Sequence, residues 1–90
     1  MKKKLTQDHI DKGTRGMMNL CPLALCLKEV YPQCKILVDV ETVDKTKYVP
    51  NVTVNDEWVE FDDPDKVADF IIRYDASKAV KPFFLSWKDM

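Results

Sequence analysis

The sequence predicts an α+β fold in which a small, mainly antiparallel sheet packs with two or three helices. One reason is the two-residue spacing of Ile36, Val38 and Val40, which is typical of a strand with one buried face. A second is an apolar stripe at helical spacing, formed by Val67, Phe70, Ile71 and Tyr74. A third is the dipeptide Asn55-Asp56, which tolerates positive φ angles and predicts a two-residue hairpin turn.

A length of 90 residues predicts a single domain covering 1–90. Capping residues mark where its helices begin and end. Thr6 and Asp63 are suited to cap helices, Pro22 and Pro64 suit a first helical turn, and Gly13 is expected to close the first helix. The expected elements are a strand over 1–5, helices over 7–12 and 22–30, strands over 35–43, 48–54 and 57–61, a helix over 64–77 and a strand over 83–87. The predicted order is therefore β-α-α-β-β-β-α-β.

Composition and charge argue against several classes of protein. The net charge is −1, so no overall field attracts nucleic acid. No apolar run is long enough to span a membrane, and no apolar stretch follows the N-terminal lysines as it would in a signal peptide. We therefore expect a cytoplasmic protein with no membrane partner, whose 3 cysteines are free thiols.

The stretch from Arg15 to Cys26 has the most suggestive chemistry in the chain. Cys21 and Cys26 lie five positions apart, which on a helix turns their side chains roughly 140° away from each other. We therefore expect no metal and no cofactor. A helix start lowers the pKa of a thiol, so Cys21 is a candidate nucleophile, with His9 as the one available histidine base.

The same stretch also fits an anion site. Free backbone N–H groups at a helix start, with Arg15 and Gly16 just before it and Asn19 as a further donor, suit phosphate or carboxylate. Cations near the end of the chain are plausible further phosphate partners. The predicted ligand-binding residues are Arg15, Gly16, Asn19, Cys21, Arg73, Lys78 and Lys81.

The second predicted helix is apolar on all sides, because Leu23 to Leu27 form an unbroken apolar run. One side of this helix can pack on the sheet, but the other side needs a second cover. Either the other helices of the chain or a second subunit would provide it. The second alternative predicts a homo-oligomer.

Two motifs frame the chain. The first part contains Thr6-x-x-His9-Ile10-x-x-Gly13, Arg15-Gly16 and Cys21-Pro22-x-Ala24-Leu25, and the last part contains Tyr74-Asp75-Ala76-x-Lys78-x-Val80-x-Pro82-Phe83. Together they resemble a family of small uncharacterised proteins of bacteriophages and prophages. The resemblance implies a phage origin, and hence the cytoplasm of a bacterial host, but it implies no activity.

Three hypotheses for function follow. The first is a non-enzymatic binding protein, a homo-oligomer that captures a small anionic ligand such as a nucleotide signal. Phage counter-defence proteins of this size provide the analogy. The second is a protein-interaction module that inhibits a host enzyme, for which Trp58 and Trp87 would be exposed contact residues. The third is an enzyme that uses Cys21 with His9.

Overall fold

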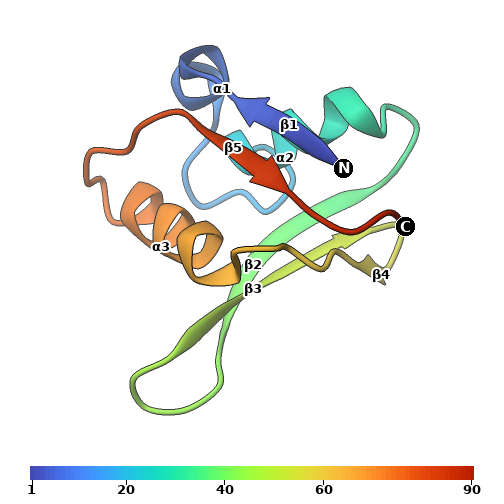
Figure 1. Cartoon of the computed structure of the whole chain (residues 1–90). Coiled ribbons are helices and arrows are strands. Elements are labelled where there is room, and N and C mark those ends of the chain that lie inside the picture. The colour runs from blue at the N-terminus through green and yellow to red at the C-terminus, as the bar shows by residue number, and fades with distance from the viewer.

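The computed structural model describes residues 1–90 and confirms the predicted α+β fold and element order (Figure 1). The elements are β1 (Lys2–Leu5), α1 (Gln7–Lys12), α2 (Pro22–Val30), β2 (Ile36–Thr42), β3 (Tyr48–Val54), β4 (Glu57–Trp58), α3 (Pro64–Asp75) and β5 (Phe83–Ser86). None of the three helices is both long and apolar enough to cross a membrane.

Strands β2, β3 and β4 form an antiparallel sheet with one covered face. Val38 pairs with Val52 on the buried face, which α2 and α3 cover. The predicted hairpin turn joins β3 to β4, with φ angles of 50° at Asn55 and 69° at Asp56. The turn fixes the register, so that Val54 faces Glu57 and the exposed side chain of Trp58 lies on the open face.

Strands β1 and β5 form a second, two-stranded antiparallel sheet. The segment after β4 connects the two sheets by backbone hydrogen bonds. Its Val59 N–H donates to the Val52 oxygen of β3, and its Asp62 N–H donates to the Ser86 oxygen of β5. The strands therefore form two sheets, because the chain leaves β3 after two residues of pairing and turns along β5.

Helix α2 is covered on both sides by its own chain. It packs between the β1–β5 sheet, α1 and strand β2, and Leu23, Cys26 and Leu27 are fully buried (Figure 1). Leu25 is the one apolar residue of the run that is half-buried. The apolar helix is thus no argument for a second subunit, since the chain itself supplies the second cover.

One detail of packing differs from the predictions. Trp87 is only 1% exposed, because β5 directs Leu85 and Trp87 into the core, where the Trp87 Nε1 donates to the Tyr31 hydroxyl. Gly13 closes α1 as predicted, with an ordinary φ of −66°. Its lack of a side chain matters because a Cβ atom there would lie 2.5 Å from Pro22 at the start of α2.

Candidate functional site

At the start of α2, the arginine that was predicted to bind an anion contacts another part of the protein. The Arg15 Nε donates to the main-chain oxygen of Tyr74 at 2.9 Å, and the guanidinium carbon lies 5.3 Å from the centre of the Tyr74 ring. Pro22 occupies the first turn of the helix, as predicted, and Cys21 is the N-cap residue, although its side chain makes no capping hydrogen bond. Arg15 is thus attached to the end of α3 by both its hydrogen bond and its ring contact.

A small cavity does lie beside this helix start, but it suits an anion poorly. Gly16 and Cys21 line it together with the carboxylates of Asp39 and Asp75, and its volume is about 90 Å³. Ligand pockets usually measure roughly 300–1,000 Å³. Asn19 does not line the cavity. Both its volume and its two carboxylates therefore oppose a nucleotide at this place.

Cys21 lacks the environment of a reactive thiol. The side chain is buried, and this burial raises the pKa of the Cys21 thiol above its ordinary value. The prediction of a lowered pKa was wrong because loss of hydration outweighs the backbone N–H groups of the helix start. The second thiol on this helix, Cys26, is buried more completely, and burial raises its pKa to about 12.

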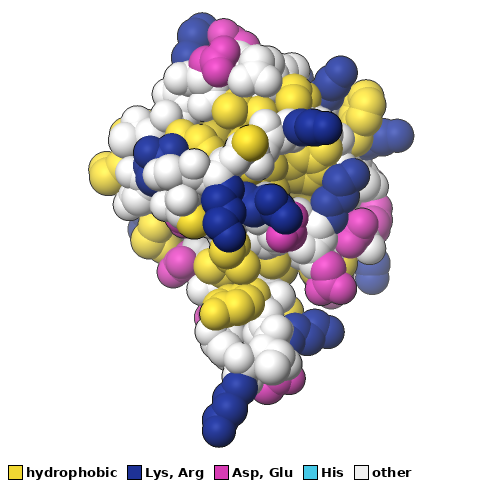
Figure 2. Space-filling model, turned by 90° about the vertical axis from the view of Figure 1, so that its left-hand side faces the viewer, with side chains coloured by type: hydrophobic (Ala, Val, Ile, Leu, Met, Phe, Trp, Pro, Cys, Tyr) yellow, Lys and Arg dark blue, Asp and Glu magenta, His cyan; other side chains and the backbone are white.

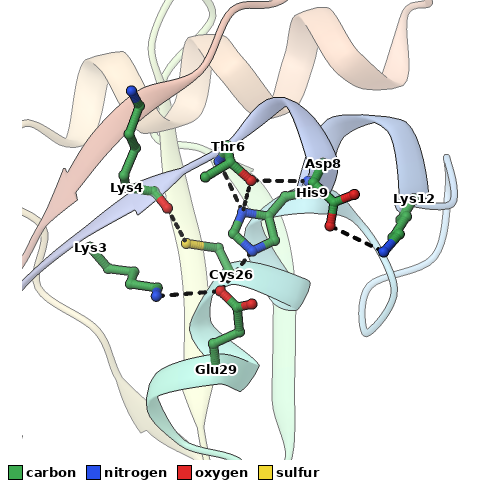
Figure 3. Close-up of polar contacts among 8 residues, drawn as sticks. All are labelled: Lys3, Lys4, Thr6, Asp8, His9, Lys12, Cys26 and Glu29. Atoms are coloured by element: carbon green, nitrogen blue, oxygen red, sulfur yellow. Dashed lines mark hydrogen bonds and ion pairs between the residues drawn. The ribbon is translucent and has the colours of Figure 1, made fainter.

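His9, the proposed base, is engaged on both ring nitrogens. The Thr6 N–H donates to Nδ1 at 2.9 Å, while Nε2 lies 2.8 Å from the Glu29 carboxylate (Figure 3). A backbone N–H can only donate, so Nδ1 is an acceptor and the proton is on Nε2. His9 therefore joins α1 to α2 as a structural residue, and neither of its nitrogens is directed to Cys21.

A larger groove lies between α3 and the segment that leads into β5. Its volume is about 420 Å³. Three cations line it, Lys66, Arg73 and Lys81. The apolar part of its surface comes from Phe70, Val80, Pro82 and Phe83. Figure 2 views this side of the molecule and shows lysine and arginine side chains around exposed hydrophobic surface.

The charges of the groove favour an anion. Arg73 pairs with Asp69 on the next turn of α3 at 3.0 Å, which neutralises one cation and fixes its position. Lys66 and Lys81 form no salt bridge. The Lys66 ammonium lies 5.4 Å from the centre of the Phe83 ring, so a cation and an aromatic surface are adjacent. The groove thus has two free positive charges beside an apolar wall.

The structure divides the predicted ligand residues between these two places. Arg73 and Lys81 line the groove, whereas Lys78 does not. The backbone N–H of Lys78 donates to the Arg73 oxygen in the turn after α3, and its side chain is exposed. Sequence reasoning missed Lys66, although its position seven residues before Arg73 places both on one face of a helix.

Comparisons with protein families, with characterised proteins and with solved structures find no match to this chain. A function for this chain therefore has to be inferred from the residues and geometry of the α3–β5 groove.

Proposed function

We propose that this protein is a non-enzymatic binding protein whose α3–β5 groove captures a small anionic, nucleotide-like ligand. The observation that carries the proposal is the placement of two cations without a salt bridge, Lys66 and Lys81, in one groove with an apolar and aromatic wall. A phosphate would contact the two ammonium groups, and a planar base would lie against Phe83 or Phe70. A volume of about 420 Å³ is within the range of ligand pockets.

The residues that line the groove support binding rather than catalysis. They include no histidine, cysteine or serine, which are the usual members of nucleophile–base pairs. The carboxylate of Asp69 is occupied by Arg73. A ligand held here would meet cations and apolar surface but no activated nucleophile.

A thermal-shift screen tests this proposal. AMP, ATP, ADP-ribose and cyclic dinucleotides would each be added at about 1 mM. A ligand present at a hundred times its Kd stabilises the folded state by about 2.7 kcal/mol, which raises the Tm of a small domain by several degrees. We expect this shift with at least one of these compounds. The absence of a shift with all of them would overturn the proposal.

A second candidate function, a module that binds and inhibits a host protein, rests on Trp58. This side chain is 55% exposed on the open face of the sheet, in register with Thr53 of β3 and, through it, Leu37 of β2. Exposed tryptophans are enriched in binding hot spots. Capture of one stoichiometric protein from host lysate, lost in Trp58→Ala, would favour this candidate. The buried Trp87 no longer supports it.

The homo-oligomer and the phage origin stay predictions of the sequence. A mass measurement in solution tests the first of them. A ligand in the α3–β5 groove contacts residues of a single chain, so this binding function is compatible with a monomer.

A further inference from the structure

The outer face of the β1–β5 sheet carries an exposed aromatic ring between two lysines. Phe84 is 55% exposed and lies opposite Lys4 in the register, while Lys2 lies opposite Ser86 on the same face. The ammonium groups of Lys2 and Lys4 lie 4.8 Å and 5.7 Å from the centre of the Phe84 ring. This face therefore combines a flat aromatic surface with two positive charges on flexible side chains.

This face continues into the groove of the proposed function. A small hollow of about 50 Å³ lies between them, and its lining includes Lys66 and Phe83 of the groove and Phe84 of the sheet. Asp62 and Asp63 also line the hollow. Their carboxylates already accept hydrogen bonds, Asp62 from the Ser86 hydroxyl and Asp63 from the Lys66 N–H. The path between the two places is thus short. A hydroxyl and a backbone N–H are neutral donors, so both carboxylates keep a negative charge that the lysines of the path have to outweigh.

We propose that the ligand is a single-stranded nucleotide chain of at least two units, which extends from the groove onto Phe84. One nucleotide lies in the groove, so this inference rests on the proposed function. The base of the next nucleotide stacks on the Phe84 ring and displaces the lysine ammonium groups, which then contact the phosphates. Stacking of bases on aromatic rings beside cations is how proteins hold single strands without reading their sequence.

The net charge of −1 predicted no nucleic acid partner. That prediction treats the chain as a uniform charge, whereas binding depends on the local field. Lys2 and Lys4 lie at one end of the proposed path, beside Phe84, and Lys66 and Lys81 line the groove at the other end. If these lysines contact the phosphates of a single strand, binding should weaken as salt is added. Each such contact makes the slope of log K against log salt more negative by about 0.7.

The test compares binding of AMP, the dinucleotide pApA and a fluorescein-labelled tetranucleotide of adenosine to the full chain. The wild type should bind pApA at least about tenfold more tightly than AMP, a gain expected from stacking one base. Phe84→Leu should lose that gain and keep its affinity for AMP, while Phe84→Tyr should retain both. Trp58→Leu is the matched control, because Trp58 is also 55% exposed but lies on the other sheet.

Two further measurements are informative. One distinguishes a long single strand from a short oligonucleotide, and the other distinguishes failure of this inference from failure of the proposed function. A twenty-nucleotide single strand that binds more tightly than the tetranucleotide indicates a longer strand, and equal affinity indicates a short oligonucleotide. Equal affinity of the wild type for AMP and pApA, or a Phe84→Leu variant that keeps the gain, would overturn this inference. If this inference fails but AMP still binds, and Lys81→Gln weakens that binding, the proposed function of the groove stands.

Discussion

The side chain of Arg15 is attached to the C-terminal end of α3, where its Nε donates to the main-chain oxygen of Tyr74 at 2.9 Å. Positive charge is favourable at this end of a helix, because the last carbonyl groups carry partial negative charge. The contact joins the loop between α1 and α2 to an element 59 residues further along the chain. Arg15 thus holds this loop against α3, and the hydrogen bond uses one of the five N–H donors of its guanidinium.

Replacement of Arg15 by alanine should therefore lower stability and leave binding in the groove unchanged. One hydrogen bond with a charged donor, partly exposed to water, predicts a loss of about 1 kcal/mol in the free energy of unfolding. Urea unfolding measures this loss, and titration with the ligand found in the screen measures affinity. If the Arg15→Ala variant is as stable as the wild type but binds the ligand ten times more weakly, the prediction is wrong and Arg15 contacts the ligand.

Gly13 should tolerate no side chain. A Cβ atom at this position would lie 2.5 Å from the Pro22 ring and 2.8 Å from its backbone nitrogen, so α1 and α2 would have to separate. We expect Gly13→Ala to cost about 1–3 kcal/mol, the usual penalty for overpacking. Gly16→Ala is a comparison of a different kind, because Gly16 has open space around it but a φ of +77°, so its cost comes from the backbone alone. If Gly13→Ala unfolds at the same urea concentration as the wild type, the close approach of the helices is unimportant.

The contact between Glu29 and His9 predicts a dependence of stability on pH. The hydrogen bond from His9, helped by the charge of Lys3, lowers the pKa of Glu29 below its ordinary value of 4.5. A carboxylate with a lowered folded-state pKa contributes stability above its unfolded pKa, and this contribution is lost as the pH falls through the folded value. Stability should thus fall below about pH 4.5 more steeply in the wild type than in Glu29→Gln. Urea unfolding between pH 3 and pH 7 compares them, and parallel curves would contradict the contact.

The three cysteines should react at different rates with a thiol reagent. Burial raises the pKa of Cys26 to about 12 and also raises that of Cys21, so both thiols stay protonated and inaccessible at pH 8. Cys34 is half-buried and open to the reagent. One thiol should therefore react in the native protein and all three after unfolding. Rapid native modification of Cys21, identified by mass spectrometry, would restore the cysteine-enzyme hypothesis.

The local chemistry of the sequence predicts most of the elements. Thr6 and Asp63 cap helices, and Asn55 and Asp56 form the turn, because each of these preferences depends on a few neighbouring residues. The positions of Trp87 and Arg15 depend instead on contacts with residues 56 and 59 positions away. Local patterns contain no information about such pairs.

The residues of the candidate site could also be predicted only in part from the sequence. Arg73 and Lys81 were predicted as phosphate partners, and both line the groove. Lys78 was predicted with them but does not line the groove, and its backbone N–H is part of the turn after α3. The groove exists only where the segment before β5 packs beside α3. Its lining therefore requires the tertiary structure.

The comparison of Lys81→Gln with Lys78→Gln tests the central claim most directly. The two substitutions remove the same charge from exposed side chains three residues apart, but only Lys81 lines the groove. Isothermal titration with the nucleotide that gives the largest thermal shift should show about tenfold weaker binding for Lys81→Gln, as expected for one lost charge-assisted contact. Lys78→Gln should bind like the wild type. Equal affinities of the two variants, whether both retained or both reduced, would contradict a ligand site in the α3–β5 groove.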